Sequence, residues 1–404
     1  MSSPAEAGPL STHYRKGDAV VVTIEKIVPR GFGLGFAENL TVLVPLAAVG
    51  DVVRVRIREC KRRLAFAEII EIQRAGPART AAPCRYYGVC GGCDLQHLTY
   101  QAQTEAKVGI IRDCLTRIGK IEFEDEIPII ASPQMLEYRS RARWHLDADR
   151  RTIGYKRRDS NAVVDIDSCA VLTPGLQSAL DYLRISADWD GLKSGLHEVE
   201  AVSGEGGRVS THFVGKTGDA AEIDIDLAGE RYSYSAETFF QANRSLVPQL
   251  IEAALGDAAG AKAFDLYCGV GLFSLPLARR FDRVFAVEEN KYAVGIARKN
   301  AGNAHIANLE IVNKSVGRFV NSGKFTEADL VLLDPPRTGP EDGVIEAIAA
   351  SQPSRISYIS CEPSILARDL RRLLDSGYSI SSITAIDLFP QTHHVETVVH
   401  LSCL

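Results

Sequence analysis

The 404-residue sequence predicts an α/β protein that ends in a doubly wound, Rossmann-like domain and begins with a small β-barrel. From about residue 236, short apolar runs alternate with helical stretches, which is typical of a parallel sheet with covering helices. Residues 13–75 instead contain β-branched runs separated by Gly-rich turns, which is typical of an OB-like barrel. A chain of this length exceeds the usual size of one core, so we expect separate domains.

Composition places the chain among ordinary globular proteins, with 46% hydrophobic and 24% charged residues. No apolar run reaches the roughly 18–20 residues of a membrane span, and the amino terminus lacks the pattern of a secretory signal. We expect residues 1–12 to form a flexible tail. Nine cysteines, an odd and unevenly spaced set, argue against a disulfide scaffold and for a reducing compartment, which we take to be the cytoplasm.

Charge is unevenly distributed along a chain whose net charge is −5. Residues 13–75 carry eleven Lys and Arg against seven acids, and residues 137–158 carry eight against three. Such basic segments on an acidic chain are expected of a nucleic-acid-binding protein, although solvated surfaces are an equally good explanation of charge alone.

The barrel is expected from three β-branched runs, 20–24, 41–44 and 52–57. The third run alternates Val with Arg, so we expect one buried face and one cationic face. Ala75-Gly76-Pro77 would end this domain as a linker.

The middle region, residues 76–235, opens with closely spaced cysteines. Cys84, Cys90 and Cys93 are interleaved with glycines that permit a tight wrap, as expected for a metal or iron–sulfur site. Cys169 is our candidate for the fourth ligand. Zinc held by four thiolates remains the alternative, because spacing does not separate iron from zinc.

A helix should follow this loop, with Val108, Ile111, Leu115 and Ile118 on one face and Gly119 as its end. The rest of the region, residues 127–235, contains Gly-bounded strands and basic turns. We therefore expect a β-rich central domain.

The last domain, residues 236–404, contains a strand that leads through Gly269-Val270-Gly271 into a helix. The next strand ends in Glu288, placed to accept hydrogen bonds from a ribose. Ser274 stands where a dinucleotide fingerprint has its third glycine. The nucleoside end of the motif is thus present and the pyrophosphate end is not, which favours S-adenosylmethionine over a nicotinamide cofactor.

Three further side chains are predicted to meet at the carboxyl edge of the sheet. Asp334 follows an apolar strand and precedes two prolines, a pattern that is also common in simple turns. Cys361 ends the next apolar run, where a buried structural cysteine is the alternative. Glu396 begins the last strand, which often runs antiparallel in such folds and would then bring its start to the same edge.

With these residues assembled, the chain resembles the RNA 5-methyluridine methyltransferases, and in particular their iron–sulfur branch with an N-terminal TRAM domain, which includes 23S rRNA (uracil-5-)-methyltransferases. The resemblance covers nearly the whole chain. It rests on the barrel, the cysteines, the segment Phe239-Phe240-Gln241-Ala242-Asn243, Ser360-Cys361-Glu362-Pro363 and the base motif at Glu396. Glu362 and Leu272 depart from the commonest family residues, which bears on affinity or substrate preference and not on the reaction.

The resemblance implies a role for each of these positions. Cys361 would be the nucleophile that adds to C6 of uracil, and Glu396 the general base that removes the C5 proton after methyl transfer. The pocket for S-adenosylmethionine would be formed by Gln241, Tyr267, Glu288 and Asp334. A [4Fe-4S] cluster would be held by Cys84, Cys90, Cys93 and Cys169.

The expected partner is structured RNA, with rRNA favoured over tRNA. We expect a monomer that does not associate with a membrane. The barrel and the Arg139, Arg141 and Arg143 run would contact the RNA backbone. Two enzyme alternatives stay open: a tRNA 5-methyluridine methyltransferase and an RNA 5-methylcytidine methyltransferase. A third alternative is a cluster-containing RNA-binding or redox-sensing module without catalysis.

Overall fold

The computed structural model describes residues 14–215 and 220–403, which divide into two compact units. Unit 1 contains the described residues up to Gly88, with Cys93–Ile110 and Gln391–His393. Unit 2 contains Val89–Gly92 and the described residues of 111–390 and 394–403. The predicted tail, residues 1–12, lies outside the described residues.

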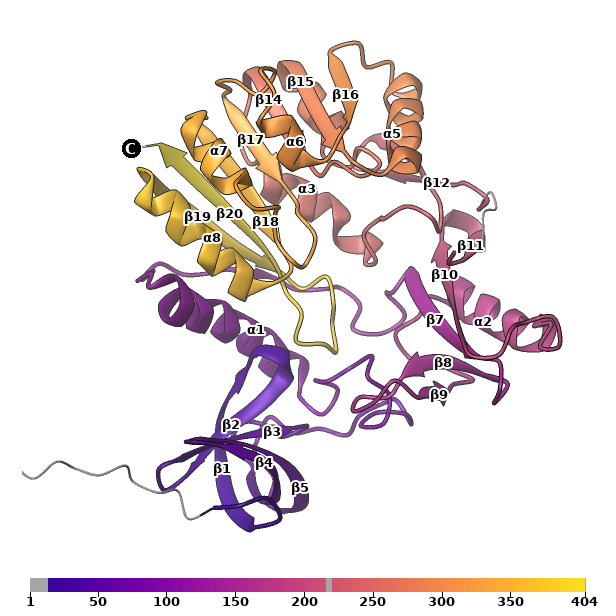
Figure 1. Cartoon of the computed structure of the whole chain (residues 1–404), viewed down its shortest axis with the longest axis vertical. Coiled ribbons are helices and arrows are strands. Elements are labelled where there is room, and N and C mark those ends of the chain that lie inside the picture. Colours follow the sequence, from indigo (N-terminus) through magenta and orange to yellow (C-terminus); the bar gives the residue numbers. More distant parts are fainter. Residues whose placement is uncertain (1–13, 216–219, 404) are drawn as a thin grey trace, which may run out of the picture. The chain divides into compact units, whose positions relative to one another are not determined.

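Unit 1 contains a closed five-stranded barrel with strand order β1-β2-β3-β5-β4 (Figure 1). Its strands are β1 (Ala19–Val28), β2 (Phe32–Ala37), β3 (Leu40–Pro45), β4 (Val52–Lys61) and β5 (Leu64–Arg74). In β4, Val53, Val55 and Ile57 are buried, while Arg54 and Arg56 are exposed. The predicted buried and cationic faces of this strand are therefore confirmed.

Helix α1 (Tyr100–Cys114) follows the cysteine loop and continues into one π-helical turn, Leu115–Gly119. Ile111 is buried as predicted, but the prediction that Ile118 shares its face is wrong, because Ile118 is 46% exposed. The wider turn of i→i+5 hydrogen bonds rotates the last residues out of the 3.6-residue period.

The end of this turn is formed by Lys120, which has a left-handed backbone with φ 53°, and not by Gly119. Gly119 is required for another reason. A Cβ atom there would lie 2.8 Å from the backbone oxygen of Ala367 in helix α8 (Pro363–Asp375), so only glycine permits this close packing.

The central part of unit 2 is rich in strands, as predicted. A five-stranded sheet has the order β11-β10-β7-β8-β9, and a separate hairpin pairs β12 with β13. These elements, with helix α2, are β7 (Arg141–Asp147), β8 (Thr152–Lys156), β9 (Val163–Asp165), α2 (Pro174–Ser186), β10 (Leu196–Ser203), β11 (Val209–Phe213), β12 (Ile223–Leu227) and β13 (Glu230–Tyr234).

The large sheet of unit 2 has eight strands in the order β16-β15-β14-β17-β18-β20-β19-β6. Its strands are β6 (Ile129–Ile130), β14 (Gly260–Leu266), β15 (Phe281–Glu288), β16 (Leu309–Asn313), β17 (Leu330–Leu333), β18 (Arg355–Ser360), β19 (Tyr378–Ile386) and β20 (Glu396–Cys403). Strands β14 to β18 pair in parallel, while β20 is antiparallel to both β18 and β19. The predicted reversal of the last strand is thus confirmed.

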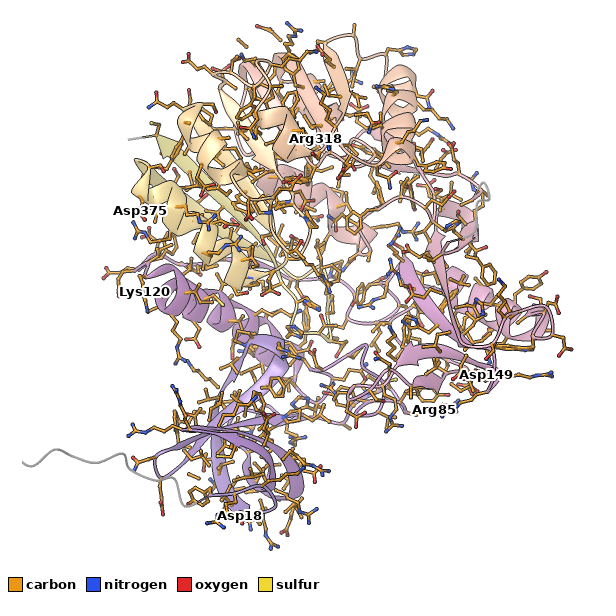
Figure 2. All side chains as sticks on the ribbon, in the orientation of Figure 1. Asp18, Arg85, Lys120, Asp149, Arg318 and Asp375 are labelled. Carbon is orange, nitrogen blue, oxygen red and sulfur yellow. The ribbon has the colours of Figure 1, made fainter. Side chains whose placement is uncertain are left out.

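Helices alternate with the parallel strands, as in a doubly wound fold. They are α3 (Val247–Leu255), α4 (Ser274–Ala278), α5 (Lys291–Asn303), α6 (Val316–Val320), α7 (Val344–Ala350) and α8. An apolar core between helices and sheet includes Leu250 of α3, Val284 of β15 and Leu332 of β17. Phe264 of β14 stacks on Phe285 of β15 at 5.3 Å. Charged residues on the outer sides, such as Arg318 of α6 and Asp375 of α8, are exposed (Figure 2).

Candidate active site

The carboxyl edge of the large sheet brings Cys361 and Glu396 together. Strand β18 ends at Ser360, which pairs with Thr397 of the antiparallel β20. Continuing this register by one residue places Cys361 opposite Glu396. Glu396 is only 3% exposed, and Cys361 is partly buried.

The electrostatic surroundings of the Cys361 thiol disfavour its ionisation in the protein without ligands. Burial raises the pKa of Cys361 to about 12, and the nearby carboxylates of Glu396 and Asp334 add to this effect. Arg337 acts in the opposite direction through its positive charge and a hydrogen bond. The thiol therefore depends on nearby positive charge to become a thiolate.

Buried carboxyl groups crowd this edge of the sheet. Burial and Asp265 raise the pKa of Asp334 to about 7. Burial and, to a lesser extent, Asp334 raise the pKa of Glu396 well above its ordinary value, against the effect of Arg337. Burial also raises the pKa of Asp265 to about 7. Such a group of mutually repelling acids favours a ligand that carries positive charge.

The turn after β14 has the backbone geometry expected of a close approach to a ligand. Gly269 and Gly271 have φ of 55° and 91°, and Tyr267 also has a left-handed backbone, with φ 67°. For a residue with a Cβ atom this conformation is uncommon and is found at functional sites.

Glu288, at the end of β15, holds this turn in place. Its carboxylate accepts hydrogen bonds from the backbone nitrogens of Gly269 at 3.0 Å and Asn290 at 2.7 Å. Each carboxylate oxygen has a further lone pair, so the expected bonds to ribose hydroxyls remain compatible with this arrangement.

Ser274 explains the missing third glycine of the dinucleotide fingerprint. Its side chain is fully buried, and its hydroxyl donates a hydrogen bond to the carboxylate of Asp265. The second oxygen of Asp265 is buried without a partner in the described part of the chain. A hydroxyl, which glycine lacks, is thus needed to satisfy a buried acid beside the turn.

Gln241 lies in the segment before α3 and supplies a second unpaired polar atom. Its side chain is 3% exposed, and its Oε1 atom is buried without a hydrogen-bond partner among the described residues. Native proteins seldom leave such an atom unsatisfied, so Gln241 fits a ligand-binding role. Unpaired acceptors and crowded acids together fit the ammonium and sulfonium groups of S-adenosylmethionine.

The sequence did not reveal the importance of Arg337 and Glu341. Both lie in the loop after Asp334, and Glu341 accepts hydrogen bonds from the Tyr267 hydroxyl and, at 3.2 Å, from the backbone nitrogen of Gly317. Arg337 was visible in the Asp-Pro-Pro-Arg motif, but only the fold shows that it acts on both Cys361 and Glu396.

Part of the predicted basic RNA surface has an internal role. The side chain of Arg141 is 19% exposed and bonds Glu200 and, at 2.5 Å, the carbonyl of Thr238. Arg143 also pairs with Glu200 but is 57% exposed. Of these two cations, Arg143 is the one that a solvent-side ligand can reach.

The four candidate cluster cysteines are all partly exposed. Cys84 and Cys93 belong to unit 1, whereas Cys90 and Cys169 belong to unit 2. No group of three or more His, Cys, Asp or Glu side chains arranged to hold a metal ion is found among the residues that the structure describes.

Within unit 2, Cys90 and Cys169 approach the same side chain. Burial is the main cause that raises the pKa of the Tyr155 hydroxyl, and both thiols contribute to the increase. The backbone supports this proximity, because Gly91 donates a 2.9 Å hydrogen bond to Lys156. Two thiols from distant parts of the sequence thus lie near one tyrosine.

Comparison with known proteins identifies two family matches. Residues 217–403 match the family model for tRNA (uracil-5-)-methyltransferases, and residues 15–70 match the TRAM domain. No helix in the described ranges is long and apolar enough to cross a membrane.

Individual relatives align over almost the whole chain. A protein of Thermotoga maritima described as an RNA methyltransferase is 31% identical, over 94% of this chain and 98% of its own. A 23S rRNA (uracil(1939)-C(5))-methyltransferase of Pseudomonas putida is also 31% identical, over 93% and 92%.

A solved structure extends the likeness to the fold. The tRNA (uracil-54, C5)-methyltransferase of Pyrococcus abyssi, in complex with S-adenosyl-L-homocysteine, superimposes with a TM-score of 0.74 at 25% identity. The match covers 94% of this chain and 100% of that one.

Proposed function

The chain belongs to the RNA (uracil-5-)-methyltransferase family, and on this premise we propose that it forms 5-methyluridine in 23S rRNA with S-adenosylmethionine as methyl donor. The observation that carries the proposal is that Cys361 directly follows β18 where Glu396 begins the antiparallel β20, so that the charge of Glu396 acts on the thiol among crowded carboxyl groups. A thiol and a carboxyl on facing residues are the two groups that this chemistry requires.

Cys361 acts as the nucleophile. C5 of uracil is a weak nucleophile until a thiolate adds to C6, which forms a C6–S bond and moves an electron pair toward C5 and O4. Arg337 favours the thiolate by its charge. The positive charge of the bound cofactor would act in the same direction.

When bound, S-adenosylmethionine supplies the methyl group that C5 takes. Glu396 then accepts the proton from C5, the C5–C6 double bond re-forms, and the C6–S bond breaks to release Cys361. Burial and Asp334 raise the pKa of Glu396, so Arg337 and the positive charge of the bound cofactor would favour the carboxylate form that accepts the proton.

The remaining pocket residues hold and orient the cofactor. Glu288 would bind the ribose hydroxyls, and Gln241 and Asp334 would face the amino acid part. Tyr267, fixed by Glu341, would shape the floor of the pocket.

We propose further that Cys84, Cys90, Cys93 and Cys169 hold a [4Fe-4S] cluster. The supporting observations are the spacing of the first three thiols and the approach of Cys90 and Cys169 to Tyr155. The cluster has no part in the methylation steps, and a zinc ion held by the same four thiolates is the alternative ligand chemistry.

The RNA contacts are assigned to the cationic face of β4 in the TRAM barrel and to Arg143. The target base must leave its stack to reach Cys361. We place the enzyme in the cytoplasm as a monomer.

The choice of RNA rests on the relatives. The Pseudomonas protein is named for 23S rRNA and aligns at 31% identity, while the Pyrococcus structure is named for tRNA and aligns at 25%. We therefore favour rRNA, and tRNA is the second candidate. Mass-spectrometric mapping of 5-methyluridine in both RNAs from cells lacking the protein tests this choice: loss of one 23S rRNA site supports it, and loss confined to tRNA contradicts it.

A further inference from the structure

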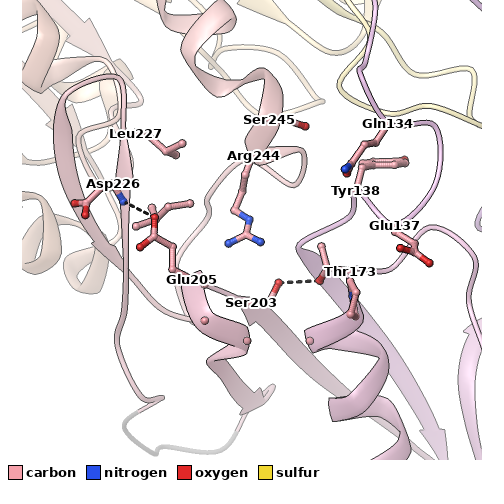
Figure 3. A pocket seen from close by; sticks show the side chains of 16 residues that line it. Gln134, Glu137, Tyr138, Thr173, Ser203, Glu205, Asp226, Leu227, Arg244 and Ser245 are labelled. Carbon is pink, nitrogen blue, oxygen red and sulfur yellow. Dashed lines mark hydrogen bonds between the residues drawn. The ribbon is translucent and has the colours of Figure 1, made fainter.

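A cavity lies in unit 2, bordered by the central sheet, the β12–β13 hairpin and the segment before α3 (Figure 3). Its volume is about 700 Å³, within the range of small-ligand sites. The side chains that line it include both hydrogen-bond donors and acceptors: Gln134, Glu137, Thr173, Glu205, Arg244 and Ser245.

Arg244 supplies the positive charge of this cavity. Its side chain extends into the middle of the space, as Figure 3 shows. Its guanidinium interacts with the Tyr234 hydroxyl, but it forms no ion pair within the described residues, although acidic residues line the same cavity. The half-buried guanidinium therefore keeps most of its donors for a ligand.

Glu205 supplies the matching acceptor. One of its carboxylate oxygens accepts a 3.2 Å hydrogen bond from the backbone nitrogen of Asp226, which fixes the group and leaves the other oxygen available. Both Glu205 and Arg244 act on the pKa of the buried Tyr234 hydroxyl, which burial raises to about 12. That hydroxyl donates to the backbone oxygen of Ser203 at 2.9 Å, so the two side chains converge on a fixed point.

We infer that this cavity binds an unstacked guanine of the substrate RNA. Guanine presents acceptors, O6 and N7, that suit a guanidinium fork, and donors, N1–H and N2–H2, that suit a carboxylate. Adenine lacks this pair of donors. A phosphate would gain from Arg244 but would be repelled by the carboxylates of Glu205, Asp226 and Glu137.

The position of the cavity suits a nucleotide near the target base. Arg244 follows Gln241 by three residues, so their Cα atoms are at most about 11 Å apart. Recognition of splayed bases by side-chain edges is the usual route to sequence specificity in RNA. This inference rests on the proposed action on RNA and adds a specificity site outside the catalytic residues.

The test measures binding of guanosine and adenosine 5′-monophosphate to the full-length protein by calorimetry. The cofactor pocket is first saturated with S-adenosylhomocysteine, so that nucleotides cannot enter it. We expect guanosine monophosphate to bind roughly tenfold more tightly than adenosine monophosphate. Glu205→Gln and Arg244→Lys should each reduce that preference to within about twofold, while Arg318→Ala, on the exposed side of α6, should leave it intact.

Equal affinity for the two nucleotides in the unaltered protein would overturn the inference, as would full competition by ribose 5-phosphate, which would indicate a phosphate site. A preserved guanine preference in both variants, with circular dichroism confirming their fold, would also overturn it.

Methylation of RNA is assayed in parallel. There, Arg244→Lys should raise KM about tenfold with kcat retained. Failure of guanine binding in an enzyme that still methylates uridine refutes this inference alone, whereas loss of methylation with guanine binding intact refutes the proposed function alone.

Discussion

Cys361 directly follows β18 and Glu396 begins β20, each one residue beyond the antiparallel pair formed by Ser360 and Thr397. The parallel part of the sheet delivers the thiol to its carboxyl edge, and the reversed β20 delivers the carboxyl group to the same place. The proposed nucleophile and base are therefore held next to paired strands, which favours precise placement on a flat base.

Replacing Cys361 with Ala should abolish methylation, because no other group forms the bond to C6. The expected loss is at least about a thousandfold in the rate of methyl transfer to RNA, measured with radiolabelled S-adenosylmethionine. Cys403→Ala, at an exposed position on β20, is the matched control and should retain full activity. Persistent methylation by Cys361→Ala would remove it from the mechanism.

Glu396→Gln should stop the reaction after methyl transfer, because an amide cannot accept the C5 proton. A covalent protein–RNA complex is then expected to accumulate, visible as a slower band on a denaturing gel. The double variant with Cys361→Ala provides the control and should show no such band. Ordinary turnover by Glu396→Gln would show that another group acts as the base.

The crowded carboxyl groups predict an unusual pH dependence of stability. Folding raises the pKa of Asp334 from 3.8 to about 7, so the folded protein binds more protons than the unfolded chain. The stability gained from the protonated group is present below about pH 4 and is lost as the pH rises toward 7. The asparagine side chain of the Asp334→Asn variant does not ionise, so this variant should not lose stability in this way as the pH rises.

Thermal unfolding of the protein without cofactor checks this prediction. The melting temperature of Asp334→Asn relative to the unaltered protein should increase between pH 5 and pH 7.5. The exposed substitution Asp375→Asn (Figure 2) should show no such trend. A difference that stays constant across this range would show that Asp334 is already ionised in the folded protein.

Arg337 is expected to support the reactivity of Cys361. Its removal in Arg337→Ala raises the pKa of the thiol further, so alkylation of Cys361 by iodoacetamide at pH 8 should slow by roughly fivefold to tenfold. The rate is measured by mass spectrometry of the peptide that carries Cys361. Arg318→Ala should alkylate at the normal rate, and an equal rate in Arg337→Ala would exclude the electrostatic role.

Iron content and visible absorption test the proposed cluster independently of catalysis. Protein purified without oxygen should contain about four iron atoms per chain and absorb visible light broadly, and Cys90→Ser should lose both properties. A colourless protein with one bound zinc would contradict the assignment of iron.

Much of this architecture could be predicted from local sequence patterns. The Val and Arg alternation of β4 revealed its two faces, and apolar runs before Asp334 and Cys361 revealed buried strands, because both patterns depend only on neighbouring residues. Ile118 could not be placed, since a π-helical turn changes the period without a clear sequence signal.

Long-range partners were also beyond the sequence. The hydroxyl of Tyr267 donates a hydrogen bond to Glu341, 74 residues later, and the hydroxyl of Ser274 donates one to Asp265 across a turn. The effect of Arg337 on Cys361 requires that two neighbouring strands end at one edge, which only the assembled sheet determines.

The most direct test of the mechanism uses RNA that contains 5-fluorouridine. Fluorine at C5 cannot be removed as a proton, so the methylated adduct should remain bound to the protein when S-adenosylmethionine is present. With 23S rRNA and tRNA transcripts as substrates, peptide mass spectrometry should find a methylated fluorouridine attached to Cys361. An adduct on any other residue, or complete methylation of ordinary uridine with no adduct on the fluorinated RNA, would contradict the account.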